Sequence, residues 1–165
     1  MKKLFGPIIV LTLLVSTLPA QKAGVEVPLR FDQYHSLDRV YAALEALHKA
    51  YPQLTALETV GKSEEGRPIM AMTVNNPKTG AALGKPAMYV DGNMHGNEIQ
   101  GGDISLYLLD YLLGNYGKNA EITALVDRVC VYVVPVVNVD GRYHFFADAN
   151  NPSGNRTLRI PIDDD

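Results

Sequence analysis

An imidazole and a carboxylate stand three residues apart in the segment DGNMHGNE, as His95 and Glu98. In a turn that leads into a helix, side chains at this spacing can point toward one place. Zinc accepts both ligand types, and a catalytic zinc ion typically takes three protein ligands and one water. The pair therefore predicts a metal site. The alternative that needs no metal is an exposed ion pair, worth at most about 1 kcal/mol.

The elements around this pair must hold it at the end of a strand. The apolar run at 87–93 predicts a short strand that is buried on both faces. A helix is expected from about Glu98 to Leu113, with Asn97 as its N-cap and Gly114 as its stop. The pair would then lie in the turn between the strand and the helix.

The rest of the chain alternates between helical and extended patterns. Apolar residues at helical spacing predict helices over 31–51 and 120–127. Extended patterns predict a hairpin of strands at 54–61 and 69–76 and a buried strand at 129–138, with irregular chain after Asn138. These elements predict an α/β domain with a mixed, mostly parallel central sheet and flanking helices. Functional residues collect beyond the carboxyl ends of such strands, where this order places the pair and the motif NVDG.

Composition and the N-terminus bound the function. The chain has 165 residues, 47% of them hydrophobic, and a net charge of −3, which argues against nucleic acid as a partner. A basic start, an apolar run and Ala20 predict that residues 1–20 are a signal peptide, with a membrane-spanning helix as the alternative. Residues 21–165 are then expected to be one secreted or periplasmic domain without a stable membrane anchor. Cys130 is the only cysteine, so no intramolecular disulfide can form, and it is expected to be a buried apolar residue.

Several motifs together carry a resemblance to a known family. DGNMHGNEIQGG closely resembles the first zinc-binding segment of metallocarboxypeptidases of the carboxypeptidase A type (M14-like). GKSEEGRPI resembles the family's hairpin turn. VYVVPVVNVDG resembles the strand that ends in its Asn-Pro-Asp-Gly motif, with Val139 in place of proline. The match spans 34–141, and it implies that residues 21–165 are the N-terminal part of a zinc carboxypeptidase-like domain, truncated at its C-terminus.

The resemblance implies a site as well as a fold. His95 and Glu98 match two of the three protein ligands of one Zn²⁺ ion, and the substrate would be a peptide or protein cleaved at its C-terminus. The third ligand, a histidine, and the general base, a glutamate, would lie beyond residue 165, so the chain as given should be inactive. Arg156 or Arg159 could be the arginine that stabilises the oxyanion, or both could be ordinary loop residues.

The remaining polar residues have plainer explanations. His144 follows the NVDG motif too closely to match the third ligand, and His35 and His48 are expected to face solvent or to cap packing. Arg67 is expected to be structural, and Asp140 either orients its loop or is simply a turn-forming aspartate. The terminal DDD could begin a calcium loop or be a solvated acidic loop. Two other functions stay open: a zinc deacylase of the aspartoacylase type, and a non-catalytic exported module that binds peptides.

Overall fold

The computed structural model describes residues 29–147. The predicted signal peptide, Arg156, Arg159 and the DDD segment lie outside them. The elements are, in chain order, α1 (Leu37–Ala50), β1 (Thr55–Lys62), β2 (Pro68–Val74), two 3₁₀ turns (Pro77–Thr79 and Ala82–Gly84), β3 (Ala87–Asp91), α2 (Ile99–Asn115), α3 (Ala120–Arg128), β4 (Cys130–Val134) and α4 (Val139–Ala147). No helix within the described part of the chain is long and apolar enough to cross a membrane.

The four described strands form one mixed sheet in the order β1-β2-β4-β3. The hairpin partners β1 and β2 are antiparallel, β2 and β4 are antiparallel, and β3 and β4 are parallel. The predicted mixed sheet with flanking helices is therefore confirmed. Parallel pairing does not predominate among these strands, because the hairpin adds two antiparallel ladders and only β3 reaches β4 through a helical crossover.

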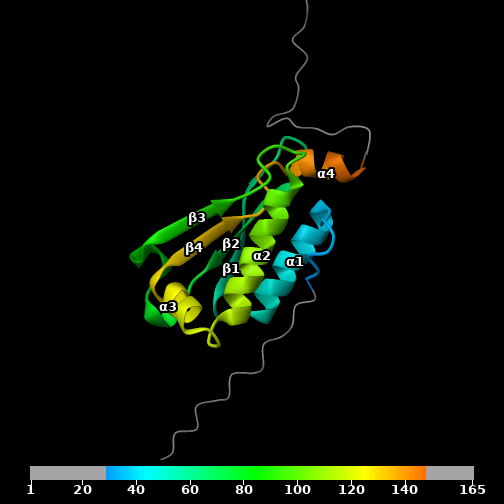
Figure 1. The fold of residues 1–165 in the computed structure, drawn as a ribbon. Helices are drawn as coiled ribbons and strands as arrows, with labels where there is room; N and C mark the ends of the chain where they lie inside the picture. The colour runs from blue at the N-terminus through cyan, green and yellow to red at the C-terminus, as the bar shows by residue number, and fades with distance from the viewer. Residues whose placement is uncertain (1–28, 148–165) are drawn as a thin grey trace, which may run out of the picture.

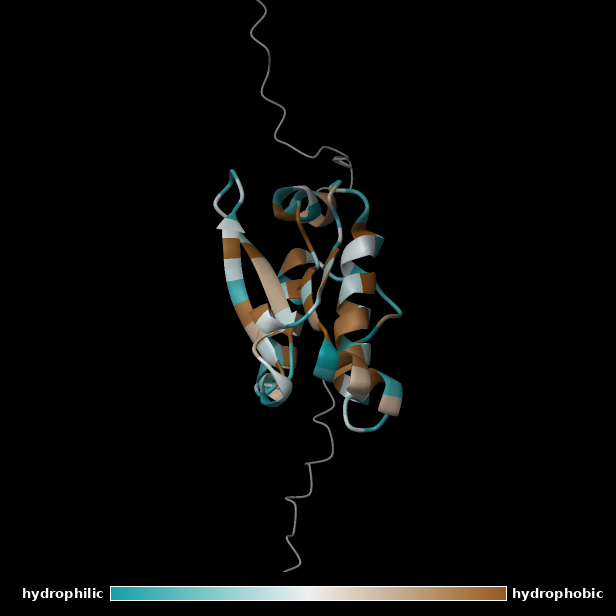
Figure 2. Ribbon diagram, turned by 90° about the vertical axis from the view of Figure 1, so that its left-hand side faces the viewer, coloured by the Kyte–Doolittle hydropathy of each residue, from teal (hydrophilic) through white to brown (hydrophobic). Residues whose placement is uncertain are grey.

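Two helices cover one face of the sheet. Figure 1 shows α1 and α2 side by side across this face, with α3 at the opposite end of the sheet from α4. Figure 2 shows apolar colouring on the strands of the sheet and on parts of the helices. The core joins buried residues of both layers, among them Leu44, Leu106, Met72, Val131 and Val133. Cys130 is buried, as predicted.

Strand β3 departs from the prediction of a strand buried on both faces. It lies at the edge of the described sheet, and Met88 and Tyr89 are 46% and 63% exposed. By contrast, β4 lies between two strands and is buried along nearly its whole length. The apolar composition of β3 could not distinguish an edge position from a central one.

The helix ends also differ from the sequence expectations. Glu98, not Asn97, occupies the N-cap position of α2, and the helix continues through Gly114 to Asn115. The irregular chain expected after Asn138 is not found over Val139–Ala147, which form α4. Asn138 caps this helix, because its side-chain oxygen accepts the Gly141 N–H at 2.8 Å and its carbonyl accepts the Arg142 N–H at 3.0 Å.

Candidate metal site

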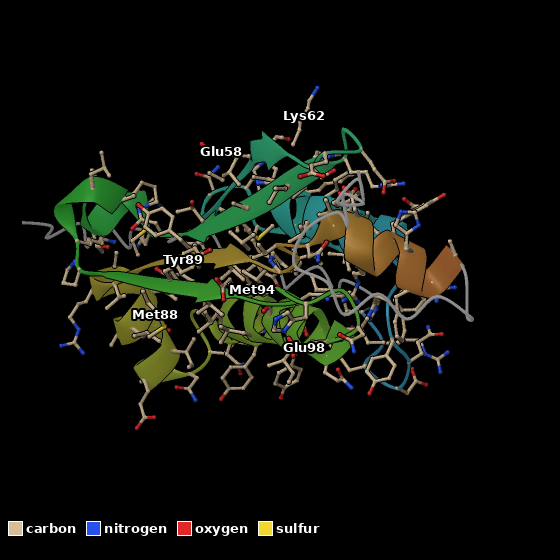
Figure 3. All side chains as sticks on the ribbon, turned by 90° about the horizontal axis from the view of Figure 1, so that it is seen from above. Glu58, Lys62, Met88, Tyr89, Met94 and Glu98 are labelled. Carbon is tan, nitrogen blue, oxygen red and sulfur yellow. The ribbon has the colours of Figure 1, made fainter. Side chains whose placement is uncertain are left out.

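His95 and Glu98 come together at the carboxyl ends of β3 and β4. Nδ1 of His95 lies 2.9 Å from Oε1 of Glu98. The side chains are 32% and 60% exposed, so molecules in solution can reach both. Figure 3 shows Glu98 at the end of α2 that lies beyond the arrowhead of β3. The turn between them is closed by a hydrogen bond of 3.1 Å from the Glu98 N–H to the His95 carbonyl.

The loop that carries this pair is held to the segment after β4. The Gly92 N–H donates to the Val134 carbonyl at 3.1 Å, and the Val137 N–H donates to the Gly92 carbonyl at 3.0 Å. A Cβ atom on Gly92 would lie 2.4 Å from the carbonyl oxygen of Gly101 in α2. Glycine therefore lets the loop approach the helix closely. These contacts continue the pairing of β3 with β4 past the strand ends and fix where the loop begins.

Beneath the loop lies a buried polar cluster centred on Arg142, which is 0% exposed. Its guanidinium donates to Oδ2 of Asp103 at 2.7 Å and to Oδ1 of Asn93 at 2.8 Å. It also donates to the carbonyls of Ile99 and His35. Burial lowers the pKa of Arg142, and the hydrogen bond with the Asp103 carboxylate opposes this effect. The cluster joins α4, α2, the loop and the segment that precedes α1.

A second polar cluster connects the hairpin turn to α4. Asp140 accepts hydrogen bonds from the hydroxyl of Ser63 at 2.8 Å, the N–H of Glu65 at 3.2 Å and the guanidinium of Arg67 at 2.6 Å. The Arg67 guanidinium also lies 3.8 Å from the centre of the Tyr143 ring. Burial alone would raise the pKa of Asp140, but these three hydrogen bonds hold it below its ordinary value. The structural role expected of Arg67 and the orienting role expected of Asp140 both fit these contacts.

The other histidines have partners of their own. Nε2 of His144 lies 2.6 Å from Oε1 of Glu65, and Nδ1 of His48 lies 2.9 Å from Oγ1 of Thr55. The expectation that His35 faces solvent or caps packing is wrong in its first part: His35 is 6% exposed and its ring pairs with Asp103. Sequence reasoning also missed Arg142, because an arginine two residues after an aspartate carries no signal of burial.

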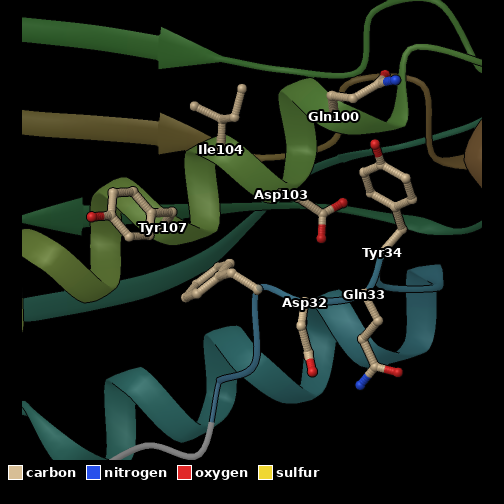
Figure 4. Close-up of a pocket in the computed structure, with 8 residues that line it drawn as sticks. Asp32, Gln33, Tyr34, Gln100, Asp103, Ile104 and Tyr107 are labelled. Atoms are coloured by element: carbon tan, nitrogen blue, oxygen red, sulfur yellow. The ribbon is translucent and has the colours of Figure 1, made fainter.

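A hollow of about 530 Å³ lies beside α2, near the buried cluster. Its walls combine aromatic and polar side chains from α2 and from the segment before α1, including Phe31, Tyr34 and Tyr107. Figure 4 shows Asp103 pointing from α2 toward this segment. The Asp103 carboxylate is already bound by His35 and Arg142, so it is committed to the protein interior.

The donor atoms of His95 and Glu98 suit zinc. Two ligands about 2.1 Å from a zinc ion at a tetrahedral angle lie about 3.4 Å apart, so the two side chains, which form an ion pair at 2.9 Å here, would have to separate by about half an ångström to bind the ion. Within residues 29–147, no group of three His, Cys, Asp or Glu side chains could hold a metal ion. The described residues thus supply two adjacent ligands of suitable chemistry, and a complete catalytic zinc site would need one more.

Comparisons with known proteins identify the family to which the chain is similar. The zinc carboxypeptidase family model matches residues 40–159. Mouse carboxypeptidase M is 34% identical over 109 residues, which cover 66% of this chain and 25% of that protein. An inactive metallocarboxypeptidase of Saccharomyces cerevisiae is 31% identical over 111 residues, covering 67% of this chain and 26% of that protein.

The fold gives the same result. The crystal structure of carboxypeptidase A from Helicoverpa armigera superposes with a TM-score of 0.67 and 27% identity, covering 76% of this chain and 29% of that one. The chain spans about a quarter of the length of the two sequence relatives. Since the family model covers well over half of the chain, the resemblance carried by the motifs is confirmed, and the chain belongs to the zinc carboxypeptidase family.

Proposed function

We propose that this chain is the N-terminal part of a zinc-dependent metallocarboxypeptidase, in which His95 and Glu98 bind one Zn²⁺ ion. The observation that carries the proposal is the 2.9 Å approach of the two donor atoms at the carboxyl ends of two parallel strands, in a chain of this family. Residues 21–165 would form this part of the catalytic domain. The third ligand and the general base would come from sequence beyond Asp165.

Each residue of the site has a distinct task in this proposal. A bound zinc ion supplies a Lewis acid that polarises a carbonyl and activates water. To bind the ion, His95 would offer a lone pair of a ring nitrogen and Glu98 its carboxylate oxygens, at the open end of the sheet where both side chains are accessible to solvent. The hydrogen bond from the Glu98 N–H to the His95 carbonyl closes the turn and would hold the two metal-binding side chains together before the zinc ion binds. Arg156 and Arg159 are candidates for contact with the oxyanion.

The substrate would be a peptide or protein with a free C-terminal carboxylate, and the protein would be exported. Residues 1–20 would direct export and be removed, which N-terminal sequencing of the secreted product tests. A product that keeps Met1 would contradict this part of the proposal.

A second candidate function is peptide binding without turnover. It is favoured by a specific observation: one relative of 31% identity is an inactive metallocarboxypeptidase. Such a protein could keep the fold and the loop but lack the general base. The deacylase alternative has no comparable observation in its favour.

The test uses the complete gene product and three blocked substrates. One is a dipeptide with a free C-terminal carboxylate, one is the same dipeptide amidated at its C-terminus, and one is an N-acyl amino acid. We expect hydrolysis of the first only, loss of activity with a chelator and recovery with Zn²⁺. The variants His95→Ala and Glu98→Ala should each lose activity and bound zinc.

The other outcomes separate the alternatives. Stoichiometric zinc without hydrolysis would support the peptide-binding module, and cleavage of the N-acyl amino acid alone would support the deacylase. Unchanged zinc content and unchanged hydrolysis in both alanine variants would refute the proposed site. The chain that ends at Asp165 should show no hydrolysis above background.

A further inference from the structure

The carbonyl oxygen of His95 is the point at which the candidate ligand pair is held. It accepts the N–H of Glu98 at 3.1 Å, which closes the turn between the two ligands. It also accepts a hydrogen bond from Nδ2 of Asn93 at 2.7 Å, and the same nitrogen donates to the carbonyl oxygen of Gly96 at 3.3 Å. The buried Asn93 side chain thus binds the backbone of the turn that positions both candidate metal ligands.

The backbone conformation and the burial of Asn93 suit this position. Its φ of 52° lies in the left-handed region, which asparagine tolerates better than most residues. It is 3% exposed, and its own carbonyl accepts the Asn138 N–H at 3.0 Å. The backbone of Asn93 is therefore fixed to the segment after β4, and its side chain reaches forward to the next turn.

Arg142 determines which way the Asn93 amide points. A guanidinium only donates hydrogen bonds, so the Asn93 atom that lies 2.8 Å from Nη1 of Arg142 must be the oxygen. The NH₂ group must then face the carbonyls of His95 and Gly96, to which it donates. A flipped amide would put two donors together on one side and two acceptors together on the other.

Arg142 is itself unable to rotate. All five of its N–H groups have acceptors: Nε and Nη2 donate to the carbonyl of His35, Nη1 donates to Asn93 and to the carbonyl of Ile99, and Nη2 also donates to Asp103. Its charge is balanced by Asp103, and it is fully buried. Arg142 therefore touches neither solvent nor substrate and acts only through the residues that it holds.

We propose that Asn93, oriented by Arg142, is a positioning residue for zinc binding. Asn93 sets the turn so that the donor atoms of His95 and Glu98 converge. This inference rests on the proposed function, since it concerns the same metal site. Removing a residue that orients a metal ligand through hydrogen bonds commonly lowers metal affinity by 10- to 100-fold. The buried hydrogen bonds from Asn93 place it in that position here.

The experiment is a titration of ¹⁵N-labelled residues 21–165, without the expected signal peptide, with Zn²⁺. NMR follows the titration and measures even a weak Kd from the amide shifts of Glu98 and Ile99. The test variant is Asn93→Gly, because glycine accepts the positive φ and loses only the side-chain amide. The control is Asn76→Ala. Asn76 is another buried asparagine, with bonds to Tyr116 and Asp127, and it follows β2 at the opposite end of the sheet. His95→Ala gives the baseline for zinc binding elsewhere.

We expect Asn93→Gly to weaken Zn²⁺ binding about tenfold in a chain whose spectrum shows it to be folded, while Asn76→Ala binds as the wild type does. Equal Kd values for Asn93→Gly and the wild type, with the shifts lost in His95→Ala, would overturn the positioning role and leave the proposed function intact. Unchanged shifts in His95→Ala would overturn the metal site itself, and the inference with it.

If Asn93→Gly does not fold, Asn93→Asp replaces it. Aspartate keeps the acceptor for Arg142 and removes the donors to the His95 and Gly96 carbonyls. Its negative charge alone would strengthen cation binding, so weaker binding points to the lost donors. Binding at or above the wild-type level in Asn93→Asp would overturn the proposal.

Discussion

Arg67 and Asp140 are 73 residues apart in the chain, yet Nη1 of Arg67 lies 2.6 Å from Oδ1 of Asp140. The contact joins the turn between β1 and β2 to the first turn of α4. Asp140 also accepts hydrogen bonds from Ser63 and Glu65 in the same turn. The position of α4, and of the Arg142 that it carries under the candidate metal loop, is thereby tied to the hairpin.

The first prediction concerns Asp140→Asn. The Asp140 carboxylate accepts three hydrogen bonds. The NH₂ group of an asparagine would face one of the three groups that donate them, and that hydrogen bond would be lost. We therefore expect the free energy of unfolding to fall by about 1.5–3 kcal/mol at pH 7. The pKa of Asp140 is lowered in the folded protein. This contribution is therefore present above the unfolded value of about 3.9 and is lost as the pH falls through the folded value.

Urea unfolding at a series of pH values measures this effect. The difference between the wild type and Asp140→Asn should be largest near neutral pH and should shrink below about pH 4. The variant should keep some acid sensitivity, because hydrogen bonds from His144 and Arg67 also lower the pKa of Glu65. A difference that stays constant from pH 7 to strongly acidic pH would show that the carboxylate charge is not involved.

The second prediction compares two glycines in the same helix, α2. A Cβ atom on Gly102 would lie 2.5 Å from Nη1 of Arg142 and 3.1 Å from the carbonyl oxygen of Pro135, whereas one on Gly114 would meet nothing within 4 Å. Gly102→Ala should therefore destabilise the protein by about 1–3 kcal/mol, because Arg142 cannot move without losing buried hydrogen bonds. Gly114→Ala should stabilise it by about 0.5–1 kcal/mol through helix propensity.

Midpoints of urea unfolding provide the comparison, with each alanine serving as the control for the other. Opposite signs are expected. If both substitutions stabilised the protein, Arg142 would not be packed against α2 as closely as the structure indicates.

The third prediction concerns the single thiol. Cys130 is 0% exposed at the start of β4, so a thiol reagent should label it only when the sheet opens. Labelling in native buffer should be slow, and the labelled fraction should rise with urea along the same curve as the loss of helical circular dichroism. Labelling in native buffer at the rate of a free peptide thiol would contradict the burial of this strand.

Most of the fold follows from local patterns in the sequence. Apolar residues at helical spacing located α1, and a dense run of β-branched residues located β4, because these patterns report directly on a buried face. Helix α4 could not be found in this way, because VDGRYHFFA has no apolar stripe and its most deeply buried side chain is that of Arg142. The capping asparagine Asn138 was the signal that could have revealed the helix.

The candidate site divides in the same way. His95 and Glu98 could be found from residue type and spacing alone, because their convergence is set by one local turn. The residues behind them could not be found, since Asn93, Asp103 and Arg142 meet only after the loop, α2 and α4 have packed. Their contacts span 39 and 49 residues of sequence, and no local pattern encodes a contact over that distance.

The last prediction tests two helix caps against each other. Asn119 caps α3: its side-chain oxygen accepts the N–H groups of Glu121 at 2.9 Å and Ile122 at 3.2 Å. Ser36 holds the same position at α1, but its side chain makes no capping hydrogen bond. Asn119→Ala should therefore cost about 1 kcal/mol in the free energy of unfolding, and Asn119→Asp should retain most of it, because a carboxylate accepts the same N–H groups and suits the positive end of the helix dipole. Ser36→Ala should change stability by only a few tenths of a kcal/mol, so equal losses in the two alanine variants would show that the hydrogen bonds at Asn119 do not account for its contribution.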